Sequence, residues 1–142
     1  MTNPLGALFA LGLAACAATT LPYSVNGDAI DEPLTKEAGD ARRGREVVIG
    51  RDANCLLCHS IPEPEQRFMG NLAPPLAGVG SRLTKAQLRL RVVDPTRLKP
   101  DVAMPAYYRT HGLDRVMEQY RGKPVLTAQQ IEDVVAYLST LR

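Results

Sequence analysis

The sequence predicts an all-α fold of one domain, with helices joined by long ordered loops. Three segments have helical hydrophobic spacing between recognisable caps, and no segment shows the alternation of a strand. The chain of 142 residues contains 11 Pro and 11 Gly, which favours long loops. Only 5% of the residues are aromatic, with no Trp and two Phe, so something other than large rings must fill the core.

Local signals define the ends of the three predicted helices. The first covers 40–50. The second covers 84–94, where Thr84 is the N-cap and Pro95 forces the preceding residue out of helical geometry. The third begins after Thr127. Its apolar side chains recur at helical spacing, at Ile131, Val134, Val135, Leu138 and Leu141.

Two long segments lack periodicity, 61–82 and 95–124, with room for a short helix near Gly112–Gln119 in the second. Structureless loops of this length are uncommon in a compact domain unless they enclose a ligand. We therefore expect a ligand-binding domain over residues 40–142, preceded by an extended arm over residues 19–39.

Residues 1–18 predict a secretory signal peptide. The apolar run 5–15 has the length of a signal-peptide core and is too short to span a membrane. No Lys or Arg precedes this run, so a buried N-terminal helix is the alternative. Cleavage is expected near 17–18, although 13–16 resembles a bacterial lipobox that would leave a lipid on Cys16. Either form of processing predicts export to the periplasm.

The charge changes sign along the chain. Residues 1–40 carry five Asp or Glu against one Lys, and residues 41–142 carry 16 Lys or Arg against 10 Asp or Glu. A solvated helix face or a docking surface for an acidic protein would explain the basic stretch 82–99. No nucleic-acid motif or aromatic platform accompanies this charge, so nucleic-acid binding is not expected. The basic residues of the stretch are Arg82, Lys85, Arg89, Arg91, Arg97 and Lys99.

The segment Cys55-Leu56-Leu57-Cys58-His59 is the strongest motif of the chain. A structural zinc site would need a second pair of ligands, and a thioredoxin-like redox pair would need a strand–helix–strand context. Neither accompanies this motif, whereas C-x-x-C-H is the direct signature of covalent haem attachment. We infer one haem c, bound through thioethers of Cys55 and Cys58, with His59 as an axial ligand of the iron.

Four residues could supply the second axial ligand: Met69, Met104, Met117 and His111. Met69 follows His59 too closely to reach the opposite face, and Met117 falls in a helical stretch where packing explains it. Met104 lies between helices in DVAMPAYY and is our predicted ligand, with His111 as the alternative. A neutral thioether raises the reduction potential relative to two histidines and closes the iron to oxygen or peroxide.

The ring nitrogen of His59 that faces away from the iron needs a fixed acceptor, and a backbone carbonyl near Pro74 is the natural supplier. Haem would also replace the missing aromatic core. We therefore expect the chain without haem to be poorly folded.

Together these features resemble the monohaem class I cytochromes c, whose first and last helices cross close to the haem. The segment PPLAGV, 74–79, resembles the family's G-P-x-L-x-G loop, in which the proline carbonyl orients the histidine ligand. The resemblance gives Pro74 this role, with Ala73 in place of the usual glycine.

A closer resemblance, over CLLCHSIP, residues 70–109 and residues 120–142, is to the SoxX subunits of the bacterial Sox sulfur-oxidation system. It implies a heterodimer with a SoxA-type cytochrome, which joins thiosulfate to a cysteine of a SoxYZ-type carrier complex as an L-cysteine S-thiosulfotransferase. The catalytic haem and cysteine belong to the SoxA-type subunit. The SoxX-type subunit would pass electrons to a small soluble cytochrome c, and the positions that match are Cys55, Cys58, His59 and Met104.

The resemblance assigns no catalytic residue to this chain. Two other functions stay open on the sequence. One is a free-standing periplasmic cytochrome c that serves an oxidase or reductase, and the other is a haem protein that handles a gas or peroxide.

Overall fold

The computed structural model describes residues 23–142. It contains four α-helices and three 3₁₀-helices, and no strand occurs within the described range beyond one isolated bridge between Asn26 and Ala29. The all-α prediction is confirmed. The α-helices are α1 (Ala41–Ile49), α2 (Val79–Arg82), α3 (Lys85–Val93) and α4 (Ala128–Leu138). The 3₁₀-helices are η1 (Cys55–Leu57), η2 (Pro95–Arg97) and η3 (Glu118–Tyr120).

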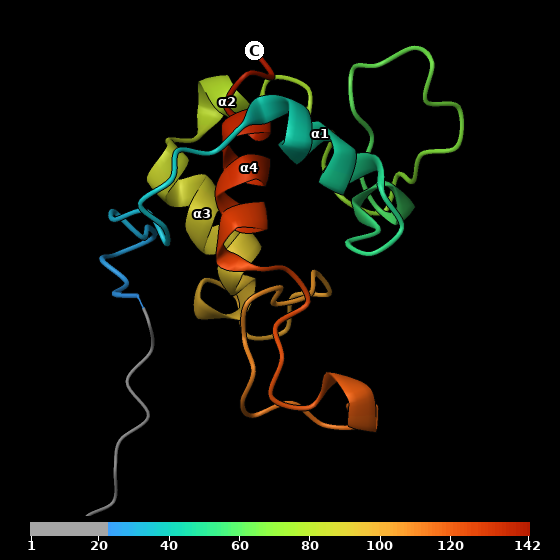
Figure 1. Cartoon of the computed structure of the whole chain (residues 1–142). Coiled ribbons are helices and arrows are strands. Elements are labelled where there is room, and N and C mark those ends of the chain that lie inside the picture. Colours follow the sequence, from blue (N-terminus) through green and yellow to red (C-terminus); the bar gives the residue numbers. More distant parts are fainter. Residues whose placement is uncertain (1–22) are drawn as a thin grey trace, which may run out of the picture.

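Helix α4 is the centre of the molecule, with α1 crossing it and α3 packed beside it (Figure 1). Gly44 makes the crossing of α1 possible, because a Cβ at that position would overlap the carbonyl oxygen of Asp133 and press on the Cβ of Tyr137. The first and last helices therefore approach backbone to backbone. This crossing is the one expected from the cytochrome c resemblance.

The three predicted helices form where their caps indicated. Asp40 accepts a hydrogen bond from the Arg43 N–H at the start of α1. Both α3 and α4 begin with a capping box, in which Thr84 and Thr127 exchange hydrogen bonds with the glutamine three residues later. The predicted apolar residues of α4 are buried, and Leu141 is buried although it lies beyond the end of the helix.

The structure corrects two details of the long loops. The segment predicted as loop over 61–82 ends in helix α2. This helix starts directly after Gly78, and it is Gly78 that has the left-handed conformation, with φ of 70°. The short helix expected near Gly112–Gln119 is reduced to the single 3₁₀ turn η3. The segment between η2 and α4 otherwise remains irregular.

Residues 23–39 of the predicted arm pack against the domain. The Ile30 side chain is 1% exposed, and its N–H donates to the Ala86 carbonyl on α3. A buried ion pair lies below it, with the Nε of Arg89 2.7 Å from Glu132 and the Arg89 Nη1 donating to the Ile30 carbonyl. The arm thus joins α3 and α4 over one side of the molecule.

The leader predicted over 1–18 and the lipobox cysteine Cys16 lie outside the described residues. Within residues 23–142, none of the helices has the length and apolarity that a membrane span requires.

Candidate haem-binding site

The turn that carries the two cysteines is short and tightly bonded. Asn54 adopts a left-handed conformation with φ of 52°, and the 3₁₀ turn η1 follows directly. The N–H groups of Cys58 and His59 both donate to the Cys55 carbonyl, at 3.2 and 3.0 Å. This turn presents both thiols from one loop, followed at once by the imidazole. Both cysteines are free thiols.

The imidazole of His59 is held by one hydrogen bond. Its Nδ1 lies 2.8 Å from the carbonyl oxygen of Pro74. A carbonyl oxygen only accepts, so the proton of this bond is on Nδ1, and Nε2 is the ring nitrogen that the bond leaves unused. The expected backbone acceptor is present at the expected proline. The ring is oriented for Nε2 to bind a metal ion.

The loop that supplies the Pro74 carbonyl is fixed from two sides. On one side it pairs with the cysteine turn, since the Ala73 N–H donates to Cys58 at 3.0 Å. On the other side the Arg82 guanidinium donates to the carbonyls of Ala77 at 2.8 Å and Pro75 at 3.2 Å. The acceptor of His59 is therefore part of a fixed frame.

The four candidate thioether and imidazole groups differ in their surroundings. Met104 is half-buried against the core, in the loop after η2. The Met69 sulfur accepts a hydrogen bond from the Ile61 N–H at 3.2 Å, in the loop that follows His59. Met117 is 61% exposed and His111 is exposed. Burial and position favour Met104 as the second ligand, which remains a prediction.

Tyr107 links the Met104 segment to the cysteine turn. Its side chain is buried, and its hydroxyl donates to the Ala53 carbonyl at 2.7 Å. Its backbone bonds to Val92 and Leu126 fix the chain three residues after Met104. Burial raises the pKa of the Tyr107 hydroxyl, with the neighbouring Cys55 adding to the effect, and burial also raises the pKa of the Cys55 thiol.

Residues 41–142 match the family model described as Cytochrome c. This chain belongs to the cytochrome c family. The cytochrome is also similar to a solved structure described as SoxXA from P. pantotrophus, with 38% identity and a TM-score of 0.78. That match covers 84% of this chain and 93% of the other chain, so the SoxX resemblance is confirmed. Among curated proteins, none matches the cytochrome.

Membership of the family implies covalently bound haem c, and the residues of the cytochrome fit that group. Two free thiols and an imidazole with Nε2 available lie on one turn, with a half-buried thioether in a separate loop. The described residues contain no group of three or more His, Cys, Asp or Glu side chains that could hold a metal ion by themselves. A zinc site therefore lacks its further ligands in the part of the chain that the structure covers.

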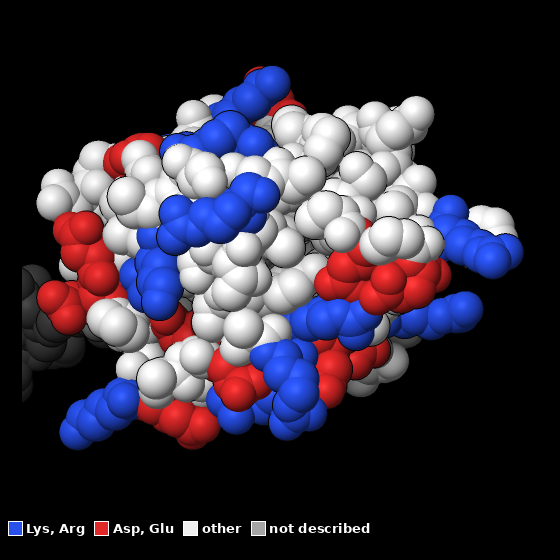
Figure 2. Space-filling model, turned by 90° about the horizontal axis from the view of Figure 1, so that it is seen from above, with Lys and Arg blue, Asp and Glu red and all other residues white. Residues whose placement is uncertain are grey.

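The basic stretch 82–99 is not one continuous surface. Arg89 is buried against Glu132, Arg91 pairs with Asp28, and Arg82 bonds to backbone carbonyls. Acidic and basic side chains are interspersed on the face shown in Figure 2. The sequence predicted a solvated face or a docking surface for this stretch and missed the role of Arg82. The one feature of the sequence that could have indicated this role is the position of Arg82, four residues after Gly78. This spacing permits the guanidinium to fold back over the loop.

Proposed function

We propose that this cytochrome is the electron-transfer subunit of a SoxAX-type complex that oxidises thiosulfate. The similarity to a chain of SoxXA, at 38% identity over most of both chains, is the observation that carries the proposal. The His59–Pro74 bond supports it, because a fixed imidazole suits a site that changes only its oxidation state.

The proposed reaction joins thiosulfate to a carrier-protein cysteine. The thiol R–SH and S₂O₃²⁻ give R–S–S–SO₃⁻, one proton and two electrons, so the bond forms only if an acceptor removes both electrons. One haem c, held by Cys55 and Cys58, would supply a one-electron iron couple. The catalytic cysteine is expected on the SoxA-type subunit, and we assign no catalytic residue to this chain.

In this proposal the residues of this chain bind the haem and orient the imidazole of His59. Cys55 and Cys58 would hold the haem through thioethers, and the Nε2 of His59 and the sulfur of Met104 would bind its iron. The Pro74 carbonyl and the Nδ1 proton keep the imidazole in one orientation. A small soluble cytochrome c would receive the electrons in the periplasm, to which the predicted signal peptide over 1–18 would direct the chain.

Co-purification tests this proposal against a free-standing cytochrome c that serves an oxidase or reductase. Affinity capture of the tagged haem-loaded chain from the periplasm should bring down a second haem-bearing subunit, visible by haem staining. Thiosulfate-dependent reduction of a small soluble cytochrome c, in the presence of a SoxYZ-type carrier, should require both subunits. A chain that elutes alone at every salt concentration, and adds nothing to thiosulfate turnover, would contradict the proposal and favour the free-standing cytochrome.

A further inference from the structure

The loop over residues 62–73 carries an unusually exposed aromatic side chain. Phe68 is 96% exposed, and it is one of only two phenylalanines in the chain. Leu72 in the same loop is 83% exposed, and Leu57, between the two cysteines, is 63% exposed. Exposed apolar clusters of this kind mark sites of protein contact.

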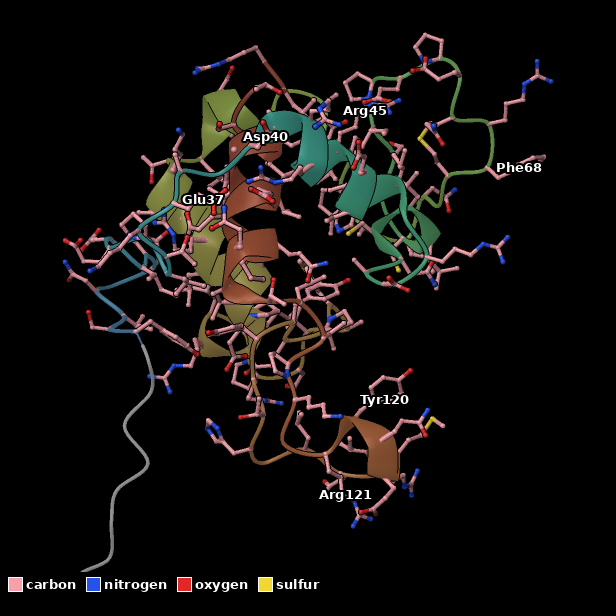
Figure 3. All side chains as sticks on the ribbon, viewed as in Figure 1. Glu37, Asp40, Arg45, Phe68, Tyr120 and Arg121 are labelled. Carbon is pink, nitrogen blue, oxygen red and sulfur yellow. The ribbon has the colours of Figure 1, made fainter. Side chains whose placement is uncertain are left out.

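The loop is held in place at its base. The Gly70 N–H donates to the Leu56 carbonyl at 2.7 Å, and Gly70 lies so close to the Leu57 carbonyl that a Cβ would overlap it. The neighbouring Met69 turns inward, where its sulfur accepts from Ile61. Phe68 points outward at the edge of the molecule, away from the helices (Figure 3). A fixed backbone therefore presents this side chain to the outside.

A groove of about 490 Å³ separates the loop from the cysteine turn and the end of α1. Its lining combines apolar side chains, among them Leu57 and Phe68, with Arg51, Arg67 and Glu65, and the Glu65 carboxylate is paired with Arg45. Both arginines of the lining are exposed, and neither forms an ion pair or a side-chain hydrogen bond with any residue of the described range. Phe68 is therefore an apolar anchor beside two unpaired cations, Arg51 and Arg67. Such a surface is complementary to a partner protein that has an apolar pocket with acidic residues around it.

The large exposed hydrophobic side chains of residues 23–142 are confined to the loops and to the 3₁₀ turns η1 and η3. Every large one within residues 23–142 lies between 57 and 72 or between 98 and 125, and none lies on α1, α3 or α4. The cluster at 57–72 is continuous with the turn that bears Cys55 and Cys58. A protein that covers this cluster would thus lie directly against the turn that carries the haem-binding cysteines, which shortens the path for electron transfer between two subunits.

We infer that Phe68, Leu72 and Leu57, flanked by Arg51 and Arg67, form the docking surface for the haem-bearing partner subunit. This inference rests on the proposed function. A soluble acceptor must dissociate in each turnover, and such electron-transfer encounters use small contacts. A nearly fully exposed aromatic anchor suits a lasting interface, whose core is aromatic and desolvated and is often centred on a few such residues.

The test compares single variants of the haem-loaded chain in binding to the purified SoxA-type subunit, by calorimetry or sedimentation. Phe68→Ala should weaken binding by at least about tenfold, as for an anchor residue. Arg67→Glu should weaken binding more at low salt than at high salt, because the new carboxylate would face the acidic residues expected around the partner's pocket. Tyr120→Ala is the matched control, since Tyr120 is 58% exposed at η3, in the other exposed cluster.

The outcomes separate the two proposals. If wild-type chain binds the partner and Phe68→Ala binds within twofold of it, or if Tyr120→Ala is equally damaging, the docking surface is wrong and the proposed function stands. If the wild-type chain itself does not bind the partner, both are wrong. Unchanged haem absorption and circular dichroism of Phe68→Ala would show that any loss comes from the surface and not from misfolding.

Discussion

At the scale of single residues, the site depends on which nitrogen of His59 is free. The hydrogen bond from Nδ1 to Pro74 settles this, and Arg82 in turn holds the carbonyls on either side of Leu76. A guanidinium can do this because its donors form a planar fork that reaches two acceptors. The orientation of the His59 imidazole, our predicted axial ligand, thus depends on an exposed arginine 23 positions away in the sequence.

Replacing Arg82 tests this dependence. Arg82→Gln should remove both bonds and lower the free energy of unfolding by about 1–2 kcal/mol, as expected for charged hydrogen bonds near the surface. The Nδ1 proton of His59 should exchange with solvent faster, which nuclear magnetic resonance of the ferrous protein would detect. Lys85→Gln, which removes an exposed charge three residues later, is the control. Unchanged proton exchange alongside lowered stability would limit Arg82 to a structural role.

Met104 is the second residue whose role can be tested directly. In Met104→Ala, we expect complete loss of the methionine–iron charge-transfer band, binding of carbon monoxide to the ferrous protein, and a lower reduction potential. Met117→Ala should change none of these properties, because its side chain is 61% exposed. A variant of Met104 that keeps the band would transfer the assignment to another residue, with His111 next to be replaced.

At the scale of elements, the crossing of α1 over α4 depends on Gly44. Gly44→Ala should lower the free energy of unfolding by about 1–3 kcal/mol, because the added methyl group meets backbone that cannot move aside without separating the helices. Arg42→Ala, on the exposed side of the same helix, should change it by about 0.5 kcal/mol or less. Urea unfolding of both variants, followed by circular dichroism, provides the comparison. Equal stability of the two variants would contradict the close approach.

The same two elements are joined by a carboxylate whose effect should depend on pH. Burial favours the neutral form of Asp133, but hydrogen bonds from Arg43, the Asp40 N–H and Gln129 outweigh it and lower the pKa below the ordinary 3.8. Its contribution to stability is therefore fully present above that pH and is lost as the pH falls through the folded-state value. Asp133→Asn should be less stable at pH 7 and show a shallower loss toward pH 3. A slope identical to that of the wild type would show that other groups dominate acid unfolding.

The elements also show which features sequence can predict. Helices α1, α3 and α4 carry their caps and apolar stripes within about ten residues, so local patterns were enough. Helix α2 was missed because four residues provide no periodicity, and its start depends on the left-handed Gly78. The sequence identifies Cys55, Cys58 and His59 as one motif because they are adjacent. The role of Arg82 could not be predicted in this way, because it depends on where the loop folds back toward the guanidinium. The packing of Ile30 on α3 likewise depends on contacts distant in sequence.

At the scale of the whole molecule, few large side chains are buried beneath the irregular segments that would surround the haem. The fully buried core consists mainly of aliphatic residues around α3 and α4, with Tyr107 and Tyr137 as its buried aromatics within residues 23–142. The loop 62–73 contributes no buried side chain to that core, and the long irregular segment between η2 and α4 contributes only Tyr107 and Leu126. A bound porphyrin would provide the large apolar surface on which these segments pack.

We therefore expect folding to depend on haem attachment. The double variant Cys55→Ala with Cys58→Ala, produced through the same export route, should lack a cooperative unfolding transition in urea and lose much of the helical circular dichroism of the haem-loaded chain. The reason is that a ligand bound only by the folded state adds its binding free energy to folding. Leu113→Ala, an exposed change that leaves both cysteines intact, should unfold cooperatively. A double variant that unfolds cooperatively with more than about half of the wild-type free energy would show that the aliphatic core around α3 and α4 folds by itself.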